Sequence, residues 1–223
     1  MPKSVGELVV RQVRRSDLSR ERKVKIGERH VNPVITISRS MGSGGRIVAR
    51  QLADDLGFSF WDHELLDAIA KEAAIPPEVV EMFDEKKVSD ISILLRAALG
   101  DHVLEKFLYL RHLARTVSAI ASVGNAVILG RGVNFLLPNA LNVRIDASLE
   151  KRIENMMRYE ACSREAALAK IRKSDRVRRQ FLLSIFGREK VDGFHYDLSI
   201  WMEKFTPPAA AQVIETALKA FRP

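Results

Sequence analysis

The stretch "SRSMGSGGR", residues 38–46, places four small residues between an apolar run and a segment with helical periodicity. The run "VITIS" covers residues 34–38, and "IVARQLADDLG" follows the stretch. Where a glycine-rich turn joins a strand to a helix, main-chain N–H groups point into the turn and the helix start adds partial positive charge. Glycine lets the chain close around phosphate oxygens, because no Cβ intrudes. The stretch therefore predicts a phosphate-binding loop, with a tight turn that binds nothing as the alternative.

The usual phosphate loop, G-x-x-x-x-G-K-[ST], contains a lysine that this stretch lacks. Arg46 is expected to supply positive charge instead, because a guanidinium makes two contacts with one phosphate. A serine hydroxyl of the loop could reach a metal ion, and the spacing does not choose among Ser38, Ser40 and Ser43. The residues expected to bind the phosphate groups of a cofactor are Ser38, Arg39, Gly42, Ser43, Gly44, Gly45 and Arg46.

A cluster of basic residues, "KIRKSDRVRR", covers residues 170–179. On a helix, Arg172, Arg176 and Arg179 fall at i, i+4 and i+7 and share one face. Several arginines on one face stabilise the charge of a phosphoryl group during transfer. The cluster predicts a basic helix that serves a binding site, and a solvated basic helix is the alternative.

The triplet "DHE", residues 62–64, places three potential metal ligands in a row. Adjacent residues on a helix point in different directions, so joint coordination of a metal is not expected. We expect Asp62 to cap the helix that follows it and His63 to line a cleft.

Apolar segments of strand length alternate with helical segments along the chain. The first helical segment, residues 45–56, ends at Gly57, and later helices begin after the capping residues Ser163 and Thr206. Such alternation predicts an α/β fold, a parallel sheet of five strands with helices on both faces. The expected strands are residues 34–38, 58–61, 125–132, 141–148 and 196–202.

The chain has 223 residues, a net charge of +8 and a single cysteine, Cys162. This length allows one large domain with a genuine core. One cysteine excludes an internal disulfide framework and a multi-cysteine metal site, and we expect Cys162 to pack between helices. The positive charge favours an acidic partner, either nucleic acid or a small phosphorylated molecule.

Residues 1–32 form a basic leader that we expect to be flexible, and residues 33–223 form the domain. No apolar stretch approaches the ~18 residues that span a membrane, and the N-terminus lacks a signal-peptide core. A cytoplasmic location without membrane contact is therefore expected. Nucleic-acid binding by the leader is a weak alternative, because no aromatic residues interleave with its charges for base stacking.

Three stretches resemble the nucleoside monophosphate kinases, and in particular the cytidylate kinase-like branch. They are "ITISRSMGSGGRIVARQLADDLGFSFWD", "VILGRGVNFLLPNALNVRIDASLEKRIE" and "KIRKSDRVRR", and together they span most of residues 34–221. The resemblance implies a P-loop kinase fold with a helical insertion at residues 63–122 and a lid-like region at residues 163–190. It also implies ATP and Mg²⁺ as cofactors and transfer of the γ-phosphoryl group to CMP or dCMP.

The resemblance implies roles for individual residues as well. It places the acceptor nucleotide at Asp62, Arg131 and Asp175. A salt-bridged residue at a strand end is the alternative for Arg131. The residues expected to act in catalysis are Arg46, Arg172, Arg176 and Arg178.

Several positions depart from the family pattern. Aligned by the loop, Arg39 replaces the first glycine, Gly45 replaces the lysine and Ile47 replaces the serine or threonine. On the acceptor side, Asp67 falls near the position of a family arginine, and Gly132 replaces the aspartate of the Gly-Arg-Asp turn. These departures keep two alternatives open: a nucleotide-binding protein with weak or no transfer activity, and a kinase of another small acceptor. The pattern also leaves open a homodimer.

Overall fold

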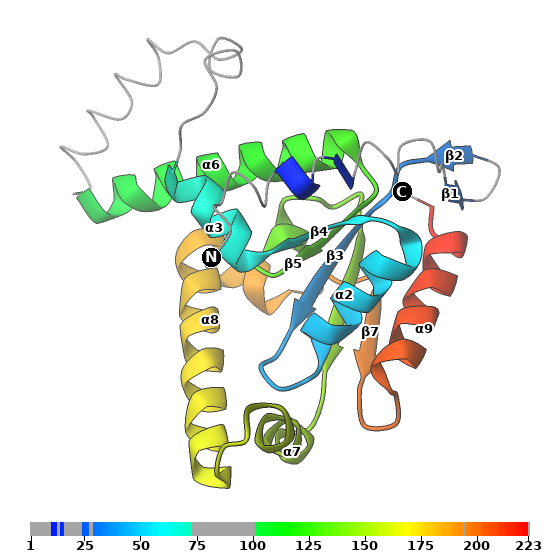
Figure 1. Cartoon of the computed structure of the whole chain (residues 1–223). Coiled ribbons are helices and arrows are strands. Elements are labelled where there is room, and N and C mark those ends of the chain that lie inside the picture. Colours follow the sequence, from blue (N-terminus) through cyan, green and yellow to red (C-terminus); the bar gives the residue numbers. More distant parts are fainter. Residues whose placement is uncertain are drawn as a thin grey trace.

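The computed structural model describes residues 10–12, 14–15, 24–26, 29–72, 101–193 and 195–222. Its centre is a sheet of five parallel strands (Figure 1). Their order is β4-β5-β3-β6-β7, so the first strand of the domain lies in the middle. The predicted parallel sheet is confirmed. The strands are β3 (Val34–Arg39), β4 (Ser59–Asp62), β5 (Ala126–Leu129), β6 (Leu141–Asp146) and β7 (Leu198–Trp201).

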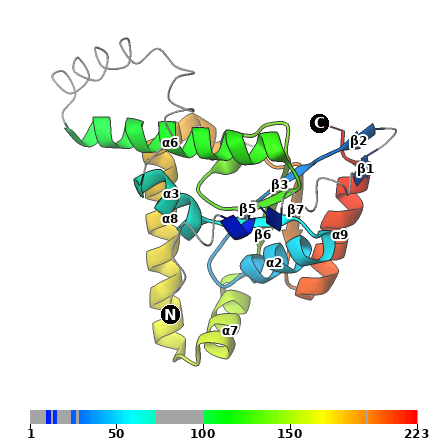
Figure 2. The same ribbon diagram turned by 45° about the horizontal axis from the view of Figure 1, so that its top comes forward.

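Helices cover both faces of the sheet, as expected, and alternate residues of the buried strands face opposite layers. On β5, Val127 and Leu129 pack in the cluster beneath α2 and α9, whereas Ala126 and Ile128 pack beneath α3 and α6. Figure 2 shows α6 on one side of the strands and α2 with α9 on the other. The helices of these layers are α2 (Gly45–Leu56), α3 (His63–Glu72), α6 (Asp101–Val123) and α9 (Pro207–Ala220).

Two further helices stand beyond the carboxyl ends of the strands (Figure 1). They are α7 (Leu149–Glu160) and α8 (Arg164–Asp192), joined by a small buried cluster that includes Ile153 and Ile171. Cys162 packs against this cluster, which confirms its expected packing role. The lid-like region is one long helix, interrupted only at Gly187 (φ 78°, ψ 164°).

The predicted helix boundaries are confirmed by their caps. Gly57 ends α2 in the left-handed conformation, and the Ser163 hydroxyl accepts a hydrogen bond from the Ala166 amide at the start of α8. Thr206 caps α9 in the same way, ahead of Pro207. Asp62 caps α3, because its Oδ1 accepts from the Leu65 amide at 3.0 Å.

The leader contains a feature that the sequence did not indicate. An antiparallel hairpin joins β1 (Val24–Ile26) to β2 (Arg29–Val31). Arg15 also donates to the Ala53 carbonyl and to Asp54, at 2.8 and 2.9 Å. These contacts attach described parts of the leader to the domain, while its flexibility stays a prediction.

Of the helical insertion expected at residues 63–122, the structure describes α3 and most of α6, and residues 73–100 lie outside the described part. A 3₁₀ turn, η1 (Val133–Phe135), follows β5. None of the described helices is long and apolar enough to cross a membrane.

Candidate functional site

The glycine loop lies between β3 and α2, at the carboxyl edge of the sheet, where ligands bind in parallel α/β folds. Gly42 and Gly44 have φ of 81° and 83°, a conformation that favours glycine. The Ser43 amide bonds the Ser40 carbonyl at 3.3 Å. The amides of Gly44, Gly45 and Arg46 have no protein acceptor within the described residues. Three adjacent donors at a helix start form the arrangement that binds an anion.

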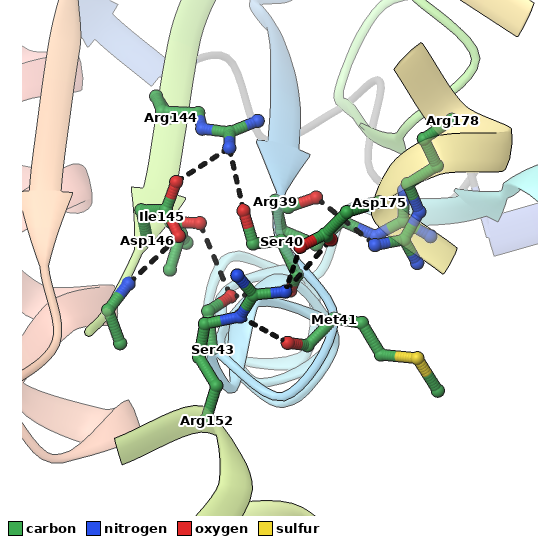
Figure 3. Close-up of polar contacts among 11 residues, drawn as sticks. Arg39, Ser40, Met41, Ser43, Arg144, Ile145, Asp146, Arg152, Asp175 and Arg178 are labelled. Carbon is green, nitrogen blue, oxygen red and sulfur yellow. Dashed lines mark hydrogen bonds and ion pairs between the residues drawn. The ribbon is translucent and has the colours of Figure 1, made fainter. Parts of the chain in front are cut away.

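Side chains from α7 hold the outer side of the loop (Figure 3). The Nε of Arg152 donates to the Met41 carbonyl at 2.6 Å, and the Asn155 amide donates to the Gly42 carbonyl at 2.8 Å. Arg152 also makes two hydrogen bonds to Asp175 of α8, at 2.8 and 2.7 Å. These bonds occupy the carbonyls of Met41 and Gly42, whereas the amides of Gly44, Gly45 and Arg46 stay available to a ligand. No sequence pattern indicated the roles of Arg152 and Asn155.

The loop serines are engaged within the protein. The Ser43 hydroxyl is buried within hydrogen-bonding distance of the Ser40 and Ile145 carbonyls, at 2.9 and 3.2 Å. Arg144 donates to the Ser40 hydroxyl at 2.7 Å, and Ser38 donates to Asn134 Oδ1 at 3.3 Å.

The residues present therefore do not fit a Mg²⁺ ion held by a loop hydroxyl. Ile47, at the position of the family's serine or threonine, has no oxygen to offer. The part of the chain that the structure describes also holds no group of three or more His, Cys, Asp and Glu arranged for a metal.

Arg39 ends β3 and extends from the loop toward β4. Its Nη2 lies 3.2 Å from Nδ1 of His63. Burial, followed by the charges of Arg178, Arg131 and Arg46, lowers the pKa of Arg39 to about 9. Burial and the charges of Arg39 and Arg131 also lower the pKa of His63 below its usual value. The site is thus strongly positive, and His63 is neutral at pH 7 and accepts from Arg39.

Arg46 is at the start of α2, half exposed, and reaches toward α3. It pairs with Asp62 at 2.7 Å and with Glu64 at 3.3 Å. The hydrogen bond to Glu64 is the main reason that the pKa of Arg46 is raised. Two carboxylates therefore hold this guanidinium, and its expected role as a substitute for the lysine stays a prediction.

Arg131 lies in the turn after β5, with φ of 57°. It forms an ion pair with Asp67 of α3, as the salt-bridged alternative expected, and its role in binding the acceptor stays a prediction. Tyr109 of α6 donates to the other oxygen of Asp67 at 2.8 Å. The Arg131 guanidinium also lies 4.9 Å from the ring centre of Phe181 in α8. This network joins the turn after β5 to α8, and no sequence pattern indicated the role of Tyr109.

Two buried donors in this region have no partner within the described residues. They are Nε of Arg131 and Nδ2 of Asn134. Asn134 is 5% exposed and follows the same turn. A buried donor without a partner is costly unless a ligand or water accepts its hydrogen bond. Both groups are therefore available to donate a hydrogen bond to a ligand.

The structure divides the arginines of α8 between two sides of the helix. Arg178 reaches the loop, with Nη1 3.5 Å from the Arg39 carbonyl (Figure 3). Arg172 and Arg176 are exposed, and the exposed Arg179 pairs with Asp192 at 2.9 Å. Of the arginines expected to act from this helix, Arg178 alone contacts the loop in the described structure.

The family model and the related sequences agree on one family. A model of the cytidylate kinase-like family matches residues 34–204. A cytidylate kinase of Pyrococcus furiosus is 27% identical over 192 residues, covering 85% of this chain and 90% of that protein. A cytidylate kinase of Thermococcus kodakarensis is 26% identical with the same coverage. A solved structure of an uncharacterized protein from Eubacterium ventriosum has a TM-score of 0.58 at 21% identity, covering 85% of this chain and 99% of that one. This last similarity concerns the fold.

Proposed function

Because the chain belongs to the cytidylate kinase-like family, we propose that it transfers the γ-phosphoryl group of ATP to a nucleoside monophosphate, with CMP or dCMP as the expected acceptor. Its α/β fold is the P-loop kinase fold that the sequence predicted. The observation that carries the proposal is the row of unpaired loop amides at Gly44, Gly45 and Arg46, beside Arg39 and Arg178. The amides suit the donor phosphates, and the arginines suit the charge that spreads over the group in transfer.

The reaction needs no covalent bond to the protein. An oxygen of the acceptor phosphate forms a bond to the γ-phosphorus, and the bond from that phosphorus to the bridging oxygen breaks. ADP leaves with the electron pair of the broken bond. The protein contributes position and charge. Mg²⁺ would arrive on the phosphate oxygens of ATP, since the loop offers it no free hydroxyl.

Arg131 is the residue best placed to bind the acceptor phosphate, because it lies at the carboxyl edge of β5 with an unpaired Nε. Asp67 opposes this role, since its carboxylate occupies Arg131. That ion pair is a specific reason to retain a second candidate function, the phosphorylation of a small acceptor other than a nucleoside monophosphate. Such an acceptor would donate a hydrogen bond to Asp67 and leave its ion pair with Arg131 in place.

The test is ADP release by the intact protein with ATP, Mg²⁺ and one acceptor at a time: CMP, dCMP, UMP or an unrelated alcohol. We expect release that depends on CMP or dCMP and falls at least about tenfold in Arg178→Met, because a charge-assisted contact is worth about 1.5–3 kcal/mol. Arg164→Met is the matched control, since that exposed arginine pairs with Glu150, away from the loop.

ADP release with the alcohol but with none of the nucleotides would favour the second candidate function, phosphorylation of another small acceptor. If no acceptor increases release, the transfer proposal is wrong. A thermal shift produced by ATP in that case would indicate a nucleotide-binding protein without transfer activity.

A further inference from the structure

We propose that Arg39 performs the task of the absent loop lysine and contacts the phosphoryl group directly. This inference rests on the proposed function and identifies the cation of its donor site. Arg46 lies closer in sequence to the lysine position, but it is held by Asp62 and Glu64. The geometry around Arg39 favours it for three reasons: the space it occupies, the route of its side chain, and its lack of a counter-ion.

The first reason is that Arg39 and a side chain at position 45 exclude each other. A Cβ added to Gly45 would lie 2.6 Å from the Cβ of Arg39 and 3.1 Å from its Cγ. A contact with a Cβ, which is fixed to the backbone, is not relieved by rotating a flexible end. In the family pattern a glycine stands at position 39 and the lysine at position 45. The two substitutions are therefore linked: in this chain the cation stands at position 39, at the end of β3, and glycine stands at position 45, at the start of α2.

The second reason is that a second glycine clears the route of this side chain. A Cβ on Gly130, at the end of β5, would lie 2.5 Å from Nη1 of Arg39. Beyond Gly130 the guanidinium reaches His63, just after β4. It therefore crosses the carboxyl ends of β3, β5 and β4, between the donor loop and the acceptor side. A phosphoryl group in transfer passes between these same two sides.

The third reason is charge. Arg46, Arg131, Arg144 and Arg152 each pair with a carboxylate. Arg39 has no carboxylate within ion-pair distance among the described residues, and its side-chain partner is the neutral ring of His63. Burial, followed by the charges of Arg178, Arg131 and Arg46, lowers the pKa of Arg39. Burying a cation without a counter-ion is costly, and a bound phosphate would remove the cost.

The test is a double-mutant cycle on the intact chain with three variants: Arg39→Gly, Gly45→Lys and the combination of both. ATP affinity is measured by calorimetry, folding by thermal unfolding, and transfer by ADP release. We expect Arg39→Gly to weaken ATP binding about tenfold to a hundredfold, the loss of one charge-assisted contact. Gly45→Lys alone should weaken binding and lower the unfolding temperature, because its Cβ meets Arg39. The combination restores the family pattern and should recover affinity to within about tenfold of the wild type.

Two further variants serve as controls. Arg39→Met keeps most of the side-chain volume, so it tests the charge even if the glycine variant folds poorly. Arg164→Met removes the same charge from an exposed site and should leave ATP affinity unchanged. Wild-type affinity in both Arg39 variants would overturn the inference. A double variant whose loss of affinity equals the sum of the two single losses would also overturn it, since the two positions would then be independent.

The readouts separate this inference from the transfer proposal. If ATP affinity follows the expected cycle but no acceptor increases ADP release, Arg39 holds the phosphates and the transfer proposal fails. If the wild type binds no ATP, both fail.

Discussion

The arginines at the carboxyl edge of the sheet affect one another through their charges. Arg131 and Arg178 lower the pKa of Arg39, and Arg131 also contributes to the lowered pKa of Arg178, behind burial as its main cause. Like charges at this proximity raise the free energy of the empty protein and lower that of its complex with an anion. Carboxylates that pair with these arginines limit this repulsion. Asp67 is the carboxylate that pairs with Arg131.

Replacing Asp67 tests whether Arg131 contacts the acceptor phosphate. In Asp67→Asn, Arg131 loses its anionic partner and Tyr109 keeps an oxygen to which it can donate. We expect the KM for CMP to fall about twofold to fivefold, because partly exposed ion pairs are worth about 0.2–1 kcal/mol. Steady-state kinetics measure this change. Asp192→Asn, which removes a carboxylate paired with Arg179, should have no effect, and an unchanged KM in Asp67→Asn would exclude Arg131 from acceptor binding.

His63 predicts a pH dependence of stability. Its pKa is lowered in the folded protein, whereas it is about 6.5 in the unfolded chain. Below about pH 6.5 the unfolded chain therefore binds a proton that the folded protein resists, and the free energy of unfolding falls as the pH falls. In His63→Asn the Oδ1 atom still accepts from Arg39 but does not titrate. Urea unfolding at pH 7.5 and 5.5 should show a smaller loss in the variant, and equal losses would contradict the assignment.

Among the elements, α8 connects the parts of the site. It contributes Arg178 to the loop, Asp175 to the arginine that holds the loop carbonyls, and Phe181 to the face of Arg131. Gly132 allows it to lie close, because a Cβ there would be 2.4 Å from Phe186 and 2.9 Å from Leu182. A side chain at position 132 would therefore require the ends of the Phe186 and Leu182 side chains to shift.

Gly132→Ala tests this packing. The new methyl group meets Phe186, and φ of 67° is unfavourable for alanine. We expect a loss of about 1–3 kcal/mol of stability, as for other overpacked sites. At about 2–4 °C per kcal/mol for a chain of this size, scanning calorimetry should detect it. Adding Phe186→Leu should recover part of the loss. A variant as stable as the wild type would show that α8 does not depend on this glycine.

The elements were more predictable from sequence than their contacts. The strand β3 and the helix α2 were predictable because apolar periodicity and glycine caps are local signals. The hairpin of β1 and β2 was not, because "VKI" and "RHV" lie in a run of charge that hides their pairing. The shared face expected of Arg172 and Arg176 was correct as helical geometry. Arg178 lies on a different side of α8 and faces the loop. Which side faces the loop depends on how α8 packs, through Ile171 and Phe186, and the sequence of the helix alone does not determine that packing.

At the scale of the whole molecule, the order of the strands assembles the site. The first strand of the domain lies between β5 and β6, so its carboxyl end meets the turn at Arg131 on one side and Asp146 on the other. The sequence predicted the glycine loop, the parallel α/β fold and several residues that the structure places near the loop, among them Arg39 and Arg178. It did not predict that Arg46 would be paired while Arg39 has no carboxylate within ion-pair distance among the described residues, because Arg46 meets Asp62 and Glu64 only once β4 lies beside the loop. A net charge of +8 is consistent with an anionic ligand but does not locate its site.

Titration of ATP into the intact protein, for the wild type and for Gly44→Val, tests most directly that the loop amides hold the phosphates. Gly44 has φ of 83°, and its missing Cβ would meet nothing closer than Met202 at 3.9 Å. Valine would thus strain the loop by about 1–3 kcal/mol without crowding the core. We predict one ATP bound per wild-type chain and affinity at least about tenfold weaker in the variant. No binding by the wild type, or equal affinity in the two proteins, would contradict the account.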